Sequence, residues 1–474
     1  MALISSVMGV GAALVAPVVE VADLSLARWG AEHVLGTSLD VVVASGGPAA
    51  AARAGAAVLE EIARLDRILS RWRPDSELAL LNRRSHLRVS ADLFAVVAKA
   101  EAWRRRTSGA FSSRLGGVPL EPGAAQSAAV RAAETAWVGM DAATGQIWRP
   151  DPVVFDLDGV AKGYILDRAL WAARRAAPES TGFMLDLGGD IRIWSAAHRR
   201  QAWRLGVTDP TQAFDNAPPL QTIALRNGAL AFSGRRARDG ESAHVLNPHC
   251  GLPAAGVLGV AAIAPIGADA DALATALAAM APEDGLGLLA QSKGFDGLLV
   301  ASDGRLLTSV NWSGQSVQAQ SVGSAWPKDF ALTATIEIPP QAGGAYERPY
   351  VAVWITDSQK KVVKTLLILG REGRWRESNY IYWRRVERMD LASVAQIART
   401  TRAPGRYEVV WDGRDDHGRP APLGSYTLNV EASREHGGHS FVALPLLLES
   451  APANFQAEKA QELGVTRARF GPAR

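Results

Sequence analysis

The sequence predicts an α+β protein in which a large domain of mixed sheets and helices is followed by a small all-β sandwich. Three observations predict this fold class. Between residues 31 and 307, segments that alternate like strands and segments with helical spacing follow one another. Residues 311–327 are polar and small, which is typical of a linker. After them, short strand-like segments are separated by turn residues, as in a sandwich of roughly 100–120 residues.

The elements of the large domain follow in chain order from their periodicity. Residues 37–43 alternate like a strand, and residues 49–69 carry apolar side chains at helical spacing. We expect another helix over 92–103, because Ser90 can cap its first turn. Further along, we expect two short strands around Gly188-Gly189, a helix over 269–280 and a hairpin that turns at 302–304.

The second half of the chain contains the predicted sandwich strands, over residues 331–338, 350–355, 362–369, 405–411 and 426–432. Residues after Glu449 are polar, and we expect them to be loose or helical. The predicted division is a possible leader (1–28), the large domain (29–312), a linker (313–329), the sandwich (330–450) and a tail (451–474).

Composition excludes several classes of protein. The chain has 474 residues, of which 48% are apolar and 21% charged, so it has enough material for a large core. Its 51 Lys and Arg against 48 Asp and Glu give a net charge of +3 without a basic stripe, so no nucleic-acid partner is expected. The single cysteine, Cys250, excludes an intrachain disulfide and a zinc cluster built on thiolates.

The first residues, MALISSVMGVGAALVAPVVEVADL, resemble the apolar core of a signal peptide but lack a positively charged start. The run is too short and too rich in glycine for a membrane span. A plain buried segment is the alternative interpretation.

One stretch, VVFDLDGVAKGYILDRAL at 153–170, carries more polar groups than a strand-to-helix turn requires. A short apolar run ends in Asp156 and Asp158, and Gly159 opens a helix that carries Lys162 in its first turn. Turn chemistry accounts for one Asp and one Gly only. The free N–H groups at a helix start suit a phosphate, which Lys162 can also meet. Asp156 can accept from a ribose or purine, and Gly159 can offer its carbonyl to a metal.

Two other stretches contain candidate functional groups. In GADADALATALAAM, Asp271 and Thr275 are four residues apart, so their oxygens share one helix face and suit a hard cation such as Mg²⁺. The structural alternative is that Asp269 and Asp271 only stabilise the helix start. In HVLNPHCGLP, His244 follows a polar loop and precedes a turn, where a functional histidine competes with a structural one.

Together these stretches identify a resemblance to the ApbE family, the FAD:protein FMN transferases. DLDGVAKGY resembles the family motif D-[LI]-x-[GST]-[IV]-[AG]-[KE]-G-Y, and ADALATALAAM resembles A-D-[AG]-x-[AD]-T-[AG]-L. Five other segments match family motifs in the same order: LGTSLDV, ILSRWRPDSELALLN, TSGAFSSRLG, MLDLGGDIRIWS and FSGRRARDGESAHVLNPHCGLP. The resemblance spans about residues 31–310.

The resemblance implies a fold and an activity. Members cleave the pyrophosphate of FAD with Mg²⁺ and pass FMN to a Thr or Ser hydroxyl of an acceptor protein through a phosphoester bond. By motif position, His244 and Asp271 are the predicted catalytic residues. The predicted metal ligands are the Gly159 carbonyl, Asp271 and Thr275. The predicted FAD contacts are Leu35, Trp72, Ala110, Phe111, Ser112, Asp156, Lys162 and Val245.

The sequence departs from the family motifs in several places. Leu35 replaces Met, Asn247 replaces the more frequent Asp, and Cys250 replaces a small hydroxyl residue. Ser112 replaces Asp, so we expect one adenine or ribose contact to be weaker. The segment after Gly117 lacks the L-x-x-x-W-G pattern, which leaves that wall of the pocket open. TSGAFS at 107–112 belongs to the nucleotide site, and Phe111 breaks the acceptor pattern, so no self-flavinylation is expected.

The predicted sandwich has its own resemblance. EVVWDGRDDHGRPAPLGSYTLNVEA at 408–432 resembles a hairpin of Ig-like domains such as that of the flagellar hook-capping protein. Trp411, Gly413, Gly418, Gly424 and Tyr426 are expected to define the fold. The polar turn at 414–417 is expected to be solvated, with partner binding as the alternative.

Three functions remain possible from the sequence. The first is an Mg²⁺-dependent FMN transferase, periplasmic or associated with the inner membrane, acting on a redox protein with an [ST]-G-A-[ST]-like motif. The second is an FAD pyrophosphatase that releases FMN and AMP. The third is an FAD-binding or scaffold protein that has lost catalysis. A cytoplasmic location is the alternative to the periplasm.

Overall fold

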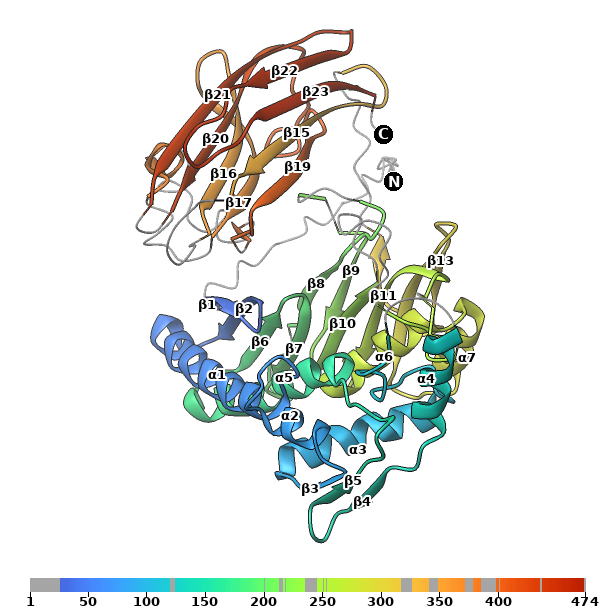
Figure 1. Ribbon diagram of the computed structural model, residues 1–474. Helices are drawn as coiled ribbons and strands as arrows, with labels where there is room; N and C mark the ends of the chain where they lie inside the picture. Colours follow the sequence, from blue (N-terminus) through green and yellow to red (C-terminus); the bar gives the residue numbers. More distant parts are fainter. Residues whose placement is uncertain are drawn as a thin grey trace, which may run out of the picture.

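The computed structural model describes residues 26–472 except 120–123, 200, 213–215, 218, 235–244, 250, 253, 317–325, 341–347, 371–377, 385–397, 400 and 435–436. Its hydrophobic clusters fall into two sets, one within residues 27–312 and one within residues 326–470. We call these the N-terminal and C-terminal domains; Figure 1 shows the C-terminal domain above the N-terminal one. No helix among the described residues is long and apolar enough to cross a membrane.

The N-terminal domain is built on an eight-stranded sheet in which every neighbouring pair is antiparallel. In spatial order its strands are β1 (Leu26–Val34), β2 (Thr37–Ala44), β6 (Gly182–Leu187), β7 (Asp190–Ser195), β10 (Gly228–Gly234), β11 (Val257–Ala264), β12 (Asp296–Ala301) and β13 (Leu306–Thr308).

Both faces of this sheet are covered. Val41 and Val43 of β2 belong to the cluster formed with the helices, whereas Val42 belongs to the cluster formed with a small second sheet. This double burial explains the continuous apolar run of β2. The covering helices are α1 (Gly47–Leu69), α3 (Ala91–Arg106), α5 (Asp158–Ala176) and α6 (Gly267–Ala279). The small sheet contains β14 (Gln315–Ser316), β9 (Gln221–Leu225) and β8 (Trp203–Val207).

The other elements of this domain lie beside the helical layer. They are a three-stranded sheet of β3 (His86–Arg88), β5 (Gln146–Trp148) and β4 (Gly139–Asp141), and the helices α2 (Glu77–Asn82), α4 (Ala124–Thr135) and α7 (Pro282–Ala290). Helix α4 occupies the region after Gly117 that lacks the family pattern.

The C-terminal domain is an all-β region of two sheets around one core. One sheet has the order β19 (Gly405–Trp411), β15 (Phe330–Ile338), β23 (Thr466–Pro472) and β22 (Ala453–Ala457). The other has β18 (Ala398–Arg399), β17 (Val362–Leu369), β16 (Tyr350–Asp357), β20 (Gly424–Ser433) and β21 (His439–Leu448). A short helical turn, α9 (Tyr380–Tyr382), packs on it. Trp411 is buried between Trp326 and Tyr426, with ring centroids 4.8 Å and 5.0 Å away.

The predicted α+β fold class is confirmed, but the expectation of a loose or helical tail over 451–474 was wrong. Strands β22 and β23 lie in that segment, and β23 pairs with β15 in the middle of its sheet. Thr466, Ala468 and Phe470 are buried and alternate with Arg467 and Arg469. The two arginines make the segment polar by composition, although its alternation is that of a strand with one buried face.

Two smaller expectations also need correction. The apolar run before Asp156 does not form a strand: Val154 makes only an isolated bridge with Leu115. The expected linker, 313–329, contains ordered residues at both ends, because Gln315 and Ser316 pair with β9 and Trp326 is buried in the C-terminal core. Residues 317–325 lie outside the described residues.

Candidate active site at the crossing of two helices

Helices α5 and α6 cross at two glycines. A Cβ atom on Gly163 would lie 2.1 Å from the carbonyl oxygen of Gly267, and a Cβ on Gly267 would lie 2.3 Å from the carbonyl oxygen of Gly163. No larger residue fits at either position without moving a backbone. The glycine that follows Lys162 in the sequence motif is therefore a packing residue, which brings the backbones of the two helices into contact.

This crossing brings the three predicted metal ligands together. The Asp271 carboxylate accepts a hydrogen bond of 2.9 Å from the backbone N–H of Gly163. One turn later on α6, the Thr275 hydroxyl lies 2.9 Å from the position that a Cβ on Gly159 would occupy. An aspartate, a hydroxyl and the first turn of α5 therefore converge from segments more than 100 residues apart in sequence.

Several carboxyl groups lie close together in the interior at this site. Burial, and then the nearby Asp190, raise the pKa of Asp271 to about 7, against the opposing effects of Lys162 and the Gly163 N–H. Burial, with a further contribution from Asp190, raises the pKa of Asp186 to about 6. Lys162 offsets part of this negative charge, because its Nζ lies 2.7 Å from Asp190 Oδ2. Lys162 was expected to meet a phosphate, and here it is paired with a carboxylate.

The predicted nucleotide turn lies directly against the metal-ligand group. The Phe111 ring is 3.3 Å from the Cβ position of Gly159, and Ala110 and Phe111 are both buried. Thr107 holds the turn, since its hydroxyl donates to the Trp103 carbonyl at 2.8 Å and accepts from Phe111 N at 3.0 Å. Thr107 is 4% exposed, so this hydroxyl is enclosed by its own fold.

A second group of predicted contacts lies at the start of α5. Asp156 forms an ion pair with Arg71 and also accepts from the Asp158 N–H at 3.1 Å. The Arg71 guanidinium lies 4.9 Å from the ring centroid of Trp72, which is 78% exposed. An open aromatic face therefore stands beside a paired cation. Arg71 was not predicted from the sequence, although it is adjacent to Trp72 in the segment ILSRW.

The remaining predicted contacts are less closely placed. Leu35 is 39% exposed in the β1–β2 turn, with a φ of 50°. Two residues later, Thr37 at the start of β2 touches the turn between β6 and β7, where its Oγ1 lies 2.5 Å from the Cβ position of Gly188. Val245 is half-buried, and its carbonyl accepts from Ala254 N at 2.9 Å. His244 lies outside the described residues, so its role stays a prediction.

The residues present fit a hard cation. The buried Asp271 carboxylate accepts a hydrogen bond from the Gly163 N–H, and it stands among other acids whose repulsion a cation would relieve. Among the residues that the structure describes, no three His, Cys, Asp or Glu side chains form a metal-binding group. The predicted site is of a different kind, with one carboxylate, one hydroxyl and one backbone carbonyl, which are the oxygen ligands that Mg²⁺ prefers.

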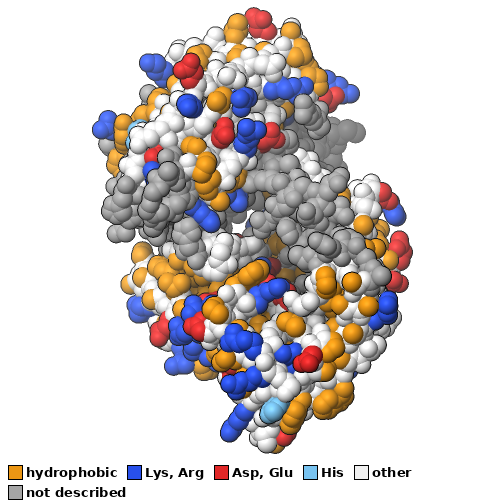
Figure 2. All heavy atoms as spheres, in the orientation of Figure 1, with side chains coloured by type: hydrophobic (Ala, Val, Ile, Leu, Met, Phe, Trp, Pro, Cys, Tyr) orange, Lys and Arg blue, Asp and Glu red, His pale blue; other side chains and the backbone are white. Residues whose placement is uncertain are grey.

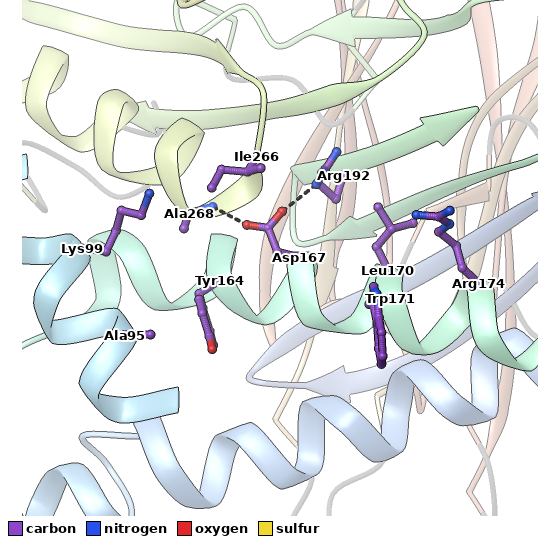
Figure 3. Close-up of a pocket in the computed structure, with 10 residues that line it drawn as sticks. All are labelled: Ala95, Lys99, Tyr164, Asp167, Leu170, Trp171, Arg174, Arg192, Ile266 and Ala268. Atoms are coloured by element: carbon purple, nitrogen blue, oxygen red, sulfur yellow. Dashed lines mark hydrogen bonds and ion pairs between the residues drawn. The ribbon is translucent and has the colours of Figure 1, made fainter. Parts of the chain in front are cut away.

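A cavity of about 320 Å³ is lined by residues of α3, α5 and β7 and by residues at the start of α6 (Figure 3). None of the predicted site residues lines it. Its Asp167 accepts from the N–H groups of Gly267 and Ala268 at 2.8 Å and 3.0 Å, and from Arg192 at 2.6 Å. Asp167 therefore fixes the start of α6, and with it the rotation that points Asp271 and Thr275 into the site.

Known proteins share this architecture and these motifs. The model of the ApbE family matches residues 35–299, more than half of the chain. The chain belongs to the ApbE family. A second family model, described as a predicted periplasmic protein (DUF2271), matches residues 331–465, which agrees with an all-β domain appended to ApbE.

Individual ApbE proteins give the same result. An FAD:protein FMN transferase of Treponema pallidum is 31% identical, over 59% of this chain and 86% of that protein. An FAD:protein FMN transferase of Haemophilus influenzae is 25% identical, over 51% and 76%. The crystal structure of the ApbE protein of Thermotoga maritima has a TM-score of 0.54 at 28% identity, covering 60% of this chain and 97% of that one. The flavin transferase ApbE of Vibrio cholerae has the same fold, with a TM-score of 0.52 at 21% identity.

Proposed function

We propose that this protein is an Mg²⁺-dependent FAD:protein FMN transferase. It would cleave the pyrophosphate of FAD and attach FMN through a phosphoester bond to a Thr or Ser of an acceptor protein with an [ST]-G-A-[ST]-like motif. The observation that carries the proposal is the convergence of Asp271, Thr275 and the first turn of α5 at the helix crossing. The family membership and the names of the relatives support it.

In this proposal, Asp271, Thr275 and the Gly159 carbonyl hold Mg²⁺. When bound, the ion neutralises the charge that builds on the phosphate oxygens during cleavage. The chain itself prepares the ligands. The Gly163 N–H fixes one oxygen of Asp271, and Asp167 fixes the helix that carries it.

His244 is the proposed base for the transfer. The acceptor hydroxyl oxygen forms a new bond to the phosphorus on the FMN side, and the proton of that hydroxyl passes to His244. The bond from the same phosphorus to the bridging oxygen breaks, and AMP leaves with the electron pair. A histidine suits this step because its ordinary pKa lies near neutral pH.

The proposed FAD contacts surround these groups. Trp72 offers an exposed ring for stacking, an interaction worth roughly 1–3 kcal/mol per base. The turn of Ala110, Phe111 and Ser112 forms one wall, and Asp156 and Lys162 supply polar groups at the start of α5. Leu35 and Val245 complete the predicted set at its edges.

We also propose a periplasmic location, supported by the description of the DUF2271 family. The acceptor is then a redox protein of that compartment.

The test is to incubate the purified protein with FAD, Mg²⁺ and an acceptor domain that carries the motif, and to weigh the acceptor by intact-mass spectrometry. We expect one FMN per acceptor. Asp271→Asn and His244→Ala should each abolish labelling. Asp269→Asn is the matched control, because Asp269 lies on the same helix but pairs with Lys99 and Trp103.

Two results would contradict the proposal in different ways. Release of AMP without labelling of any acceptor would identify an FAD pyrophosphatase. Bound FAD that stays intact with Mg²⁺ would identify a binding protein without catalysis. Full labelling by the Asp271 or His244 variant would refute the roles given to those residues.

A further inference from the structure

The Ser112 hydroxyl performs only part of what an aspartate would do at its position. It accepts from the Arg114 backbone N–H at 3.2 Å, as an Asp side chain does in the same kind of turn. It also donates its proton to Oε1 of Glu134 on α4. A neutral side chain thus supplies the turn bond, and a carboxylate from another helix stands directly behind it.

Glu134 is held in this place by a buried ionic network. Arg114 is 3% exposed and forms a 2.7 Å ion pair with Glu101. Its Nη1 also donates to the carbonyls of Ala133 and Glu134 in the last turn of α4, both at 3.3 Å, and to the Ala136 carbonyl just after the helix at 2.7 Å. The end of α4 is therefore fixed by a residue two positions after Ser112. Arg104 then bridges the network, with contacts of 3.3 Å to Glu101 and 3.4 Å to Glu134.

The charges in this network agree with that arrangement. Burial acts to raise the pKa of Glu101, but the hydrogen bonds and charges of Arg114 and Arg104 outweigh this effect. The pKa of Glu101 therefore lies below its usual value, and Glu101 is ionised. Arg114 is paired with Glu101 and with the carbonyls at the end of α4, so Arg104 is the cation that faces Glu134. The Glu134 side chain is 16% exposed, and its Oε2 lies 3.9 Å from the Cβ position of Gly109. It therefore faces the turn whose other end touches Gly159.

We propose that Glu134 replaces the carboxylate missing at position 112 and positions the 109–112 turn for FAD. The inference rests on the proposed function, because it assigns the turn to FAD binding. Ser112 and Glu134 act as one unit: the hydroxyl closes the turn and the carboxylate supplies the negative charge. Glu134 is a positioning residue, and the sequence alone gives no signal for it, since it lies in a helix without any motif.

The experiment measures FAD affinity in metal-free buffer by quenching of flavin fluorescence, for the full chain and three variants. Glu134→Ala should weaken FAD binding by about tenfold, the size of one lost hydrogen bond to a charged group. Ser112→Asp should also weaken it, because it places a second carboxylate against Glu134. The double variant Ser112→Asp/Glu134→Ala should recover to within about threefold of the original affinity, because one carboxylate is again present.

The recovery of FAD affinity in the double variant distinguishes a positioning role of Glu134 from a role in stability alone. A role limited to stability would give two losses that add, and additive losses overturn the proposal, as does unchanged affinity in Glu134→Ala. Glu134→Gln keeps an acceptor for the Ser112 hydroxyl and the same side-chain shape. It therefore tests the role of the charge if Glu134→Ala unfolds, and we expect its affinity for FAD to be lowered. The assay contains no acceptor and needs no turnover, so the proposed transferase activity can fail while this proposal stands.

Transfer kinetics give a second readout. With the acceptor present, Glu134→Ala should raise KM for FAD and leave kcat within about threefold of the original value, since binding and not the chemical step is affected. A fall in kcat with unchanged KM would contradict a positioning role.

Discussion

Asp186 lies in the segment MLDLGGDIRIWS, one residue before the end of β6. It accepts from the Gly189 N–H at 2.8 Å in the β6–β7 turn. Burial and the neighbouring Asp190 raise its pKa to about 6. Because this pKa lies above the value of an unfolded chain, near 3.9, the protonated form of Asp186 is favoured by folding.

The raised pKa of Asp186 lowers the stability of the folded protein once the pH is high enough to ionise this carboxyl, and Asp186→Asn should remove that loss of stability. The stabilising effect of proton binding is complete below about pH 4 and is lost as the pH rises through about 6. At pH 8 the variant should therefore be more stable than the original protein by about 1–3 kcal/mol, while at pH 4 the two should be nearly equal. Thermal unfolding of the metal-free protein at both pH values measures this difference.

Asp284→Asn is the control for that comparison. Asp284 is exposed in the first turn of α7, so its variant should change the unfolding temperature little, and equally at the two pH values. A stability gain for Asp186→Asn that is as large at pH 4 as at pH 8 would disprove the assignment of the titration to Asp186.

At the scale of elements, the site depends on how closely α5 and α6 approach. Gly163→Ala places a methyl group 2.1 Å from the Gly267 carbonyl, so the helices must move apart. The Gly163 N–H would then leave Asp271, and Thr275 would leave the first turn of α5. We expect FMN transfer to fall by at least about a hundredfold and stability to fall by about 1–3 kcal/mol, as for overpacked cores. Transfer assays and thermal unfolding measure the two effects.

Gly287→Ala in α7 is the matched control, because nothing lies within 4 Å of its Cβ position. Its helix should gain about 0.5–1 kcal/mol from the higher helix propensity of alanine, with transfer unchanged. Equal behaviour of the two variants would mean that the Gly163 effect comes from helix propensity and not from the crossing.

Many elements could be predicted from the sequence because local chemistry defines their ends. Ser90 accepts from Leu93 N and caps α3 as expected, and the predicted helix over 269–280 lies within one to two residues of α6. Strand β23 could not be predicted in this way. The alternation of its side chains acquires meaning only when one face is buried beside β15. The arginines on the other face make the segment polar in overall composition.

The candidate site shows the same limit. Asp271, Thr275 and Phe111 were named as candidates from the sequence because they stand in segments that resemble family motifs, and their roles stay predictions. Arg71 and Glu134 were not, since each acts through a partner that is distant in the chain, Asp156 in one case and Ser112 in the other. Such pairs are set by the packing of whole elements, which no local pattern contains.

At the scale of the whole molecule, the Asn216 side chain forms hydrogen bonds between the two domains. Asn216, in the loop between β8 and β9, donates from its Nδ2 to the Val410 carbonyl at 2.7 Å and accepts from the Val410 N–H at 2.9 Å. Val410 belongs to β19, the edge strand of its sheet. The amide of Asn216 thus pairs with the edge as a neighbouring strand would, and it satisfies backbone groups that an edge otherwise leaves open.

The same loop packs against β11 beside the end of β10. A Cβ on Gly259 of β11 would lie 2.9 Å from Pro210 of this loop, and Gly259 pairs with Gly234, the last residue of β10 before the segment that carries His244. The C-terminal domain is therefore attached to the loop that borders the strand leading to the predicted base.

Asn216→Ala should loosen this attachment. Two hydrogen bonds are lost, each worth about 0.5–1.5 kcal/mol, so deuterium uptake at the Val410 amide should become faster by about five- to a hundredfold if exchange occurs by local opening. Asn216→Asp keeps the acceptor for the Val410 N–H and should have a smaller effect. Asn227→Ala removes a similar amide that binds Ser195 N within the N-terminal domain, so it should leave β19 unchanged. Peptide-level hydrogen exchange over 405–411 measures all three, and unchanged uptake there in Asn216→Ala would show that other contacts hold the domains together.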